Sequence, residues 1–255
     1  MTYEIVSEEV DIEVGGALPM SAYLARPAGS GEHPAVLVCA ELWGVTDDVR
    51  DVVRQVAALG YVAIAPNLYH RSGPETATGL AESAANRERA FGLLGRLTRD
   101  GVETDLRAAL DFVRDHAHAA HRTGVLGFSL GGHIAYFAAS RLDLAAAAIF
   151  YPGWLPTTGT ALSRPEPLLE VATKGIADHD VNMLMFFAEL DHVIDENQRR
   201  QIGEALTSAG ARHEEIVYPG AQHAFFFPGR EPYDEAASRD SWSRVRDLFA
   251  SELGQ

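Results

Sequence analysis

The stretch Thr123-Gly-Val-Leu-Gly-Phe-Ser-Leu-Gly-Gly-His-Ile-Ala-Tyr-Phe-Ala-Ala-Ser140 carries a short apolar strand directly into a helix. At the junction lies the pattern G-x-S-x-G, which between a strand and a helix is typical of a nucleophile turn. Such a turn strains the backbone of Ser129 and raises its hydroxyl above the sheet, beside helix amides that favour an anion. Gly127 and Gly131 would avoid collisions across the turn. The alternative is a glycine-rich turn in which Ser129 only caps the helix.

A serine hydroxyl becomes a nucleophile when an oriented base accepts its proton, and in this motif the chain order is Ser, acid, His. The acid is predicted to be Asp191, at the start of a loop that follows an apolar strand. Asp195 and Glu189 are its competitors, although Asp195 is better placed to cap the next helix. The base is predicted to be His223, on the loop beyond the last strand.

Short apolar runs alternate with helical patterns along the rest of the chain. Strands are expected at 34–40, 61–65, 123–128, 145–151, 183–188 and 213–218, after an antiparallel pair at 3–14 and 20–26. Helices are expected at 47–59, 82–97, 103–118, 130–140, 196–209 and 238–252. This alternation predicts an α/β fold, with a mostly parallel central sheet and helices on both faces. A single domain over 1–255 is expected.

Composition excludes several classes of function. The chain has 255 residues and a net charge of −15, so nucleic acid and anionic membranes would repel it. One cysteine, Cys39, leaves no internal disulfide or multi-cysteine metal cluster. No apolar run reaches the ~18 residues of a membrane span, and the amino-terminal segment is acidic, unlike a secretory signal. A cytoplasmic location is the resulting expectation.

Apart from His192, which adjoins Asp191 and is a candidate for the pocket lining, the remaining histidines are interpreted as structural. His116, His118 and His121 crowd one helix end, but no carboxylate stands near them at ligand spacing, so no metal site is predicted. His133, in the first turns of the helix after Ser129, is expected to pack or to support the turn.

Taken together, these motifs resemble the dienelactone hydrolase family within the α/β-hydrolase fold. The resemblance rests on the segments 34–44, 60–69, 127–132, 151–153 and 220–225, and on Asp191. It implies that Ser129, Asp191 and His223 are nucleophile, orienting acid and general base. It also implies an oxyanion hole from the backbone N–H groups of Leu42 and Leu130. Glu41 matches a glutamate that in the family contacts and helps to activate the nucleophile.

Two departures from the family pattern concern the nucleophile and the substrate. The family's best-known members have cysteine at the position of Ser129, and its dienelactone-cleaving members have an arginine shortly after the histidine. Here the run at 225–227 is Phe-Phe-Phe, which would form an aromatic wall for a less charged or bulkier substrate. Arg71, on the polar segment at 68–78 that is expected to be a loop, is a candidate for a second cation at the substrate. The candidate pocket walls are Trp43, Tyr151, Trp154 and Phe225.

The sequence therefore predicts a serine hydrolase that cleaves a small carboxylic ester or lactone through an acyl-enzyme, without a cofactor, as a monomer or homodimer. The first alternative is a non-catalytic protein of the same fold that only binds a small molecule. The second is a metal-dependent hydrolase using the histidines near residue 118.

Overall fold

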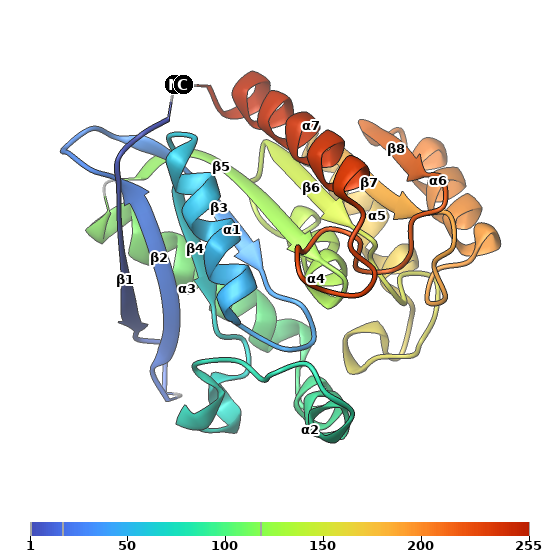
Figure 1. The fold of residues 1–255 in the computed structure, drawn as a ribbon, viewed down its shortest axis with the longest axis horizontal. Coiled ribbons are helices and arrows are strands. Elements are labelled where there is room, and N and C mark those ends of the chain that lie inside the picture. Colours follow the sequence, from blue (N-terminus) through green and yellow to red (C-terminus); the bar gives the residue numbers. More distant parts are fainter. Residues whose placement is uncertain (1, 17, 118, 255) are drawn as a thin grey trace. The chain divides into compact units, whose positions relative to one another are not determined.

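The computed structural model describes residues 2–16, 18–117 and 119–254 (Figure 1). Contacts within the chain group it into two compact units, residues 1–124 and 125–254. The boundary falls inside one strand, β5 (Ala119–Phe128). Each unit is described by itself, and the expectation of a single domain stays a prediction.

In the first unit, the strand order is β1-β2-β4-β3. Strands β1 (Ile5–Ile12) and β2 (Met20–Pro27) form the antiparallel pair that the sequence predicts, with Ile5 opposite Pro27. Strands β3 (His33–Cys39) and β4 (Val62–Pro66) pair in parallel. The β4 side chains and the last five of β3 are buried, as expected of short apolar strands covered on both faces.

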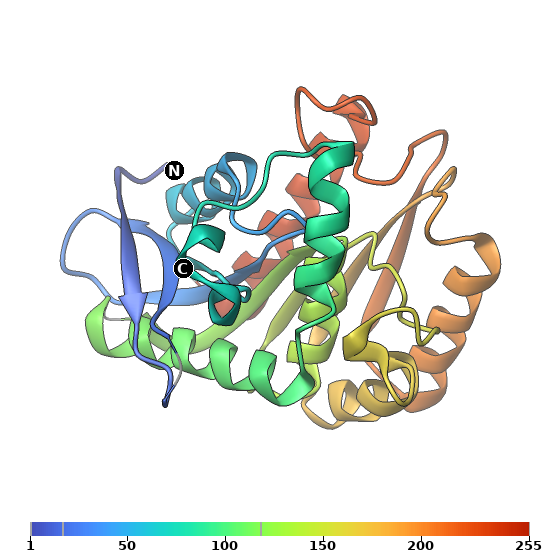
Figure 2. The ribbon, with the colours of Figure 1, turned by 90° about the horizontal axis from the view of Figure 1, so that it is seen from below.

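Helices α1 (Asp47–Ala58) and α3 (Arg99–His116) cover opposite faces of these strands (Figure 2). Helix α1 buries its valines at helical spacing, as the pattern predicts. Helix α3 begins four residues before its predicted start, because the Thr98 side chain accepts the N–H of Gly101 and caps it. Helix α2 spans Ala84–Leu94. The predicted loop at 68–78 contains two short 3₁₀ helices, His70–Ser72 and Pro74–Thr76.

The second unit contains the end of β5 and the parallel strands β6 (Ala146–Phe150), β7 (Asn182–Ala188) and β8 (His213–Tyr218), in that order. Strands β6 and β7 are almost wholly buried, whereas β8 alternates between half-buried and exposed residues. The carboxyl ends of parallel strands lie at one edge of a sheet, so the loops that follow β6, β7 and β8 gather there.

Helices α4 (Leu130–Ala139), α6 (Glu196–Ala209) and α7 (Glu235–Leu253) pack on this part of the sheet, and α5 (Leu168–Asp178) packs against α4 and α6. Helices α4, α5 and α6 lie on one side and α7 on the other (Figure 2). Helix α7 begins three residues before its predicted start because Asp234 caps it by accepting the N–H of Ala237.

Helix α5 is absent from the sequence prediction. It carries a glycine, Gly175, near its end, which locally weakens a helical pattern. A Cβ at Gly175 would lie 2.6 Å from the carbonyl oxygen of Ser140, so the glycine allows α5 to pack closely on the end of α4. Tertiary packing therefore outweighs the local preference here.

These elements confirm the predicted fold class, an α/β architecture with an antiparallel strand pair, parallel strands and helices on both faces. In the described part of the chain, no helix is both long and apolar enough to cross a membrane.

Candidate active site

Three loops of the second unit bring Ser129, His223 and Asp191 into one line of hydrogen bonds. Ser129 follows β5, Asp191 follows β7, and His223 follows β8. The Oγ of Ser129 lies 2.9 Å from Nε2 of His223, and Nδ1 of the same ring lies 2.8 Å from Oδ2 of Asp191. The exposed fractions of the His223 and Asp191 side chains are 12% and 2%, so water screens this pair weakly.

The nucleophile turn has the strained geometry that the sequence predicts. Ser129 has φ 52° and ψ −112°, a conformation that a residue with a side chain rarely adopts. Two backbone hydrogen bonds hold it: the N–H of Ser129 donates to Phe150, and its carbonyl accepts from His133, each at 3.0 Å. A Cβ added at Gly127 would lie 2.1 Å from the carbonyl oxygen of Gly131, which confirms the steric reason for a glycine at 127.

Replacing Gly127 with alanine is expected to destabilise the protein by about 3 kcal/mol or more, because the new methyl would collide with backbone that cannot retreat. Gly92→Ala is the matched control. Its Cβ would meet nothing within 4 Å inside helix α2, so about 0.5–1 kcal/mol of stabilisation is expected. Urea unfolding of the two variants measures both effects. Equal stability of the two would contradict the steric argument.

The carboxylate of Asp191 is held in one orientation. Its Oδ1 accepts the backbone N–H groups of Val193 at 2.7 Å and Ile194 at 3.1 Å, which leaves Oδ2 for His223. The competitor Asp195 instead caps α6 by accepting the N–H of Gln198, as predicted.

The second competitor, Glu189, has a structural contact that the sequence analysis missed. Its carboxylate accepts the N–H of Gly220 at 2.8 Å and so ties the loop of the acid to the loop of the histidine. The position of Glu189, directly after β7 and two residues before Asp191, was the sequence signal that could have indicated this contact.

Aromatic rings flank the histidine. Tyr151 lies edge-on to His223 at 5.0 Å between ring centroids, and the exposed His192 does so at 5.6 Å. Tyr151, Trp154 and Ala224 all have positive φ, at 36°, 61° and 66°. With Ser129, four of the five such non-glycine residues in the described chain lie in these loops, and strain of this kind is concentrated at functional sites.

The phenylalanine run at 225–227 lies in the core, which corrects the expectation of an aromatic wall. The exposed fractions are 0% for Phe225, 4% for Phe226 and 2% for Phe227. Phe225 packs 5.2 Å from the ring of Tyr151, and the other two pack 4.9 Å from Phe128, which directly precedes Ser129. The run therefore supports the loops from inside the fold.

Of the other predicted site residues, Leu130 begins α4 in the second unit and the rest belong to the first unit. Glu41 is buried after β3, and Trp43 is buried beneath the guanidinium of Arg87. Between them, the carbonyl of Leu42 accepts the hydroxyl of Tyr69 at 3.1 Å, which orients that peptide. Their predicted roles toward Ser129 stay predictions.

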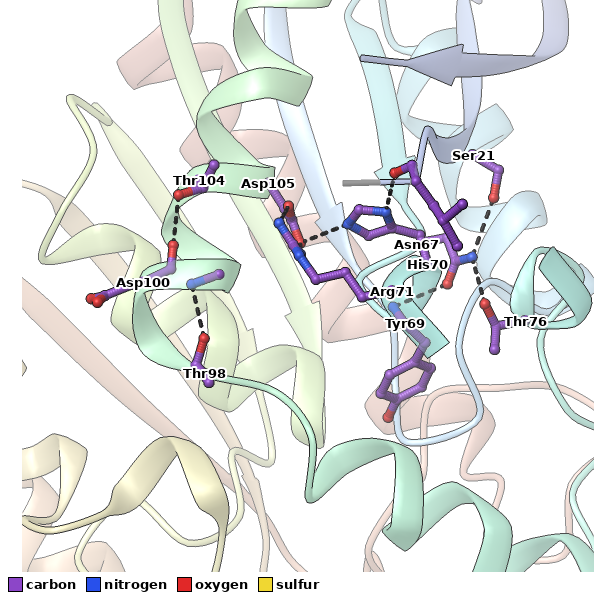
Figure 3. A network of polar contacts seen from close by, with 12 residues as sticks. Ser21, Asn67, Tyr69, His70, Arg71, Thr76, Thr98, Asp100, Thr104 and Asp105 are labelled. Atoms are coloured by element: carbon purple, nitrogen blue, oxygen red, sulfur yellow. Dashed lines mark hydrogen bonds and ion pairs between the residues drawn. The ribbon is translucent and has the colours of Figure 1, made fainter. Parts of the chain in front are cut away.

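Arg71 takes part in a buried polar network (Figure 3). Asp105 of α3 accepts both terminal nitrogens of Arg71 and faces Nε2 of His70 at 3.3 Å. The other ring nitrogen of His70 donates to the carbonyl of Leu18. Asp105 is 1% exposed, whereas the Arg71 side chain is 41% exposed. Arg71 thus anchors its own loop to α3, and its predicted contact with substrate stays a prediction.

We expect Asp105→Asn to lower the free energy of unfolding by about 3 kcal/mol, because it leaves His70 and Arg71 without their shared anion. Asp111→Asn, on the same helix but in an exposed pair with Arg114, should cost less than about 0.5 kcal/mol. Guanidinium unfolding of both variants checks this. A small loss for both would mean that the buried carboxylate is dispensable.

No three His, Cys, Asp or Glu side chains among the described residues are grouped so that they could hold a metal ion. Of the histidines considered for such a site, His118 lies outside the described residues. His133 is fully buried and packs as predicted: its ring nitrogens lie 2.9 Å from the carbonyl oxygen of Gly153 and 3.2 Å from Oγ of Ser163.

The family pattern described as "Dienelactone hydrolase family" matches residues 20–253. The chain belongs to the dienelactone hydrolase family. A protein of Synechocystis sp. named "Putative carboxymethylenebutenolidase" is 34% identical over 241 residues, 92% of this chain and 93% of that protein. A Bradyrhizobium sp. protein named "Probable 2-oxo-3-(5-oxofuran-2-ylidene)propanoate lactonase" is 28% identical, over 96% of this chain and 94% of that one.

Among solved structures, that of a "Putative Dienelactone Hydrolase" from Klebsiella pneumoniae subsp. pneumoniae is 30% identical, with a TM-score of 0.85. The match covers 97% of this chain and 99% of that chain. As a member of the dienelactone hydrolase family, the protein is a hydrolase of the carboxylic ester and lactone class.

The cysteine of this dienelactone hydrolase family member is poorly placed to react. Cys39 ends β3 fully buried, and burial raises the pKa of its thiol to about 12. The thiolate is the reactive form, so at pH 8 we expect iodoacetamide to leave the folded protein unmodified and to alkylate it after unfolding in guanidinium. Intact mass measures both states. Rapid alkylation of the folded protein would contradict this prediction.

Proposed function

We propose that the protein is a serine hydrolase that cleaves a small carboxylic ester or lactone through a covalent acyl-enzyme. The observation that carries the proposal is the unbroken hydrogen-bond line from Asp191 through His223 to Ser129. The strained turn that presents Ser129 supports it independently.

The line of contacts determines which atom can accept a proton. A carboxylate only accepts hydrogen bonds, so Nδ1 of His223 must carry its proton toward Asp191. Nε2 is then unprotonated and accepts the hydroxyl proton of Ser129 as Oγ attacks the carbonyl carbon. The protonated Nε2 next gives that proton to the leaving alkoxide. In the second half, His223 takes a proton from water as the water oxygen attacks the acyl carbon. The protonated His223 then gives that proton to Oγ of Ser129 as the acyl C–Oγ bond breaks, which releases the acid and restores the serine.

The oxyanion of the tetrahedral intermediate needs N–H donors. The N–H of Leu130 lies at the start of α4, where helix amides have no partner within the helix, and it is the first proposed donor. The N–H of Leu42 is the second, proposed from its position after β3. Glu41, Trp43, Trp154 and Arg71 stay the proposed contacts to substrate or nucleophile. Tyr151, predicted as a pocket wall, is 0% exposed like Phe225 and packs on His223 instead.

The proposed substrate class follows the relatives. Their names refer to a butenolide and an oxofuran lactone, both of which contain a cyclic ester. A cytoplasmic location and a monomeric or dimeric state stay predictions of the sequence.

Exposure to a fluorophosphonate, followed by intact mass and peptide mapping, tests the proposal without knowledge of the substrate. The reagent needs an activated serine and an oxyanion hole. We expect one stoichiometric adduct on Ser129, absent from the variant His223→Ala. Folded protein that forms no adduct would overturn the proposal and favour the non-catalytic binding protein.

A further inference from the structure

The loop Tyr151–Trp154, called the 151–154 loop below, contacts His223 and adjoins the segments that carry Asp191 and Ser129. The ring of Tyr151 packs on His223. A Cβ at Gly153 would lie 3.1 Å from a methyl of Val193, whose N–H holds Asp191. The loop thus adjoins the segments of the base and of the acid.

The same loop also adjoins the helix of the nucleophile. A Cβ at Gly132 would lie 2.7 Å from the carbonyl oxygen of Phe150 and 3.3 Å from Pro152. Any displacement of the 151–154 loop would therefore alter the surroundings of Ser129, Asp191 and His223 together.

Two residues of this loop, Tyr151 and Trp154, have positive φ. Such backbone persists only where surrounding contacts hold it. Tyr151 donates its N–H to the carbonyl of Phe186 on β7 at 2.7 Å. The centre of the loop is held by His133, which stands one helical turn after Ser129.

His133 is 0% exposed, and its Nδ1 lies 2.9 Å from the carbonyl oxygen of Gly153. A carbonyl only accepts, so Nδ1 carries the proton and donates it. Its Nε2 lies 3.2 Å from Oγ of Ser163, which is also 3.3 Å from the carbonyl oxygen of Trp154 and accepts the hydroxyl of Thr160 at 3.1 Å. Two neighbouring carbonyls of the loop thus end in one buried network, and such networks hold a single geometry.

We propose that His133 is a positioning residue: by holding the 151–154 loop against the nucleophile helix, it sets the placement of His223 and Asp191 relative to Ser129. It takes no part in proton transfer. The inference rests on the proposed function, because its effect is seen as turnover by the triad.

The test compares four variants by kcat and KM for p-nitrophenyl acetate and by the rate of fluorophosphonate labelling, below the melting temperature of each. His133→Leu removes both ring contacts, and we expect kcat and labelling to fall about 10- to 100-fold with little change in KM, as for a misplaced catalytic group. His133→Asn places an amide N–H where Nδ1 stands and should recover most of that loss. Ser163→Ala should cause a smaller fall of the same kind.

Tyr136→Phe is the matched control. It removes a buried hydroxyl on the same helix, one that bonds Thr173 of α5 and not the loop. We expect it to lower the melting temperature and leave kcat unchanged.

The outcomes separate the two proposals. If His133→Leu loses no more kcat than Tyr136→Phe, His133 is only structural and the inference is overturned. If His133→Leu does not fold, the loss of kcat in Ser163→Ala is compared with that in Tyr136→Phe, and a loss no larger than that of Tyr136→Phe overturns the inference. A wild-type protein that neither turns over ester nor labels at Ser129 overturns the proposed function, and the inference with it. An active wild-type protein whose His133 and Ser163 variants keep full kcat overturns the inference alone.

Discussion

Ser129→Ala is expected to lower kcat for an ester by at least about 10³-fold, and His223→Ala by a similar factor. The first variant removes the atom that would form the acyl-enzyme. The second removes the imidazole whose Nε2 lies 2.9 Å from that atom and would accept its proton. Because each step of the proposed mechanism needs both groups, the double variant should lose little more than either single variant.

Matched substitutions distinguish this effect from instability. Ser251→Ala removes a hydroxyl that donates to Leu248 in α7, and His213→Ala removes an imidazole in β8. Both should keep kcat within about two-fold, since surface or edge changes rarely exceed about 0.5 kcal/mol. Initial rates with p-nitrophenyl acetate, with melting temperatures measured in parallel, give the comparison. Ester turnover that survives both Ser129→Ala and His223→Ala would end the serine hydrolase proposal.

Local patterns were sufficient to predict most of the fold. The valines of α1 recur at helical spacing and are buried, and β8 and α6 have the predicted bounds, 213–218 and 196–209. Asp195 was assigned as a helix cap because an aspartate directly before a helical pattern meets free N–H groups. The line of Ser129, Asp191 and His223 was predictable for a related reason. Each follows an apolar strand, and parallel strands carry their succeeding loops to one edge.

Features that depend on side-chain packing between distant segments, which no rule of strand order brings together, were not predictable. Helix α5 packs closely where Gly175 lies against Ser140, 35 residues earlier in the sequence. No local sequence pattern indicates this contact. The run at 225–227 was interpreted as a wall because three phenylalanines follow the histidine, yet their burial depends on Phe128 and Tyr151. The hydrogen bond from His133 to the carbonyl of Gly153 likewise joins residues 20 positions apart.

Asp191→Asn is expected to lower kcat by about 10⁴-fold although it changes one atom. The backbone N–H groups of Val193 and Ile194 both point at Oδ1 and require an acceptor there. The amide must therefore place its oxygen toward them and its NH₂ group toward His223. Nδ1 of His223 then becomes the acceptor, which moves the ring proton to Nε2. A protonated Nε2 cannot take the proton of Ser129, so the base is lost while the geometry persists.

Asp195→Asn is the matched control, because asparagine caps a helix about as well as aspartate and this residue makes no contact with the triad line. It should leave kcat unchanged. The tautomer argument also predicts that the residual activity of Asp191→Asn rises with pH, as hydroxide replaces the missing base. A flat pH profile at a modest loss of kcat would show that Asp191 only stabilises the charged imidazolium and does not select the tautomer. An effect of Asp195→Asn as large as that of Asp191→Asn would instead mean that the acid was assigned to the wrong residue.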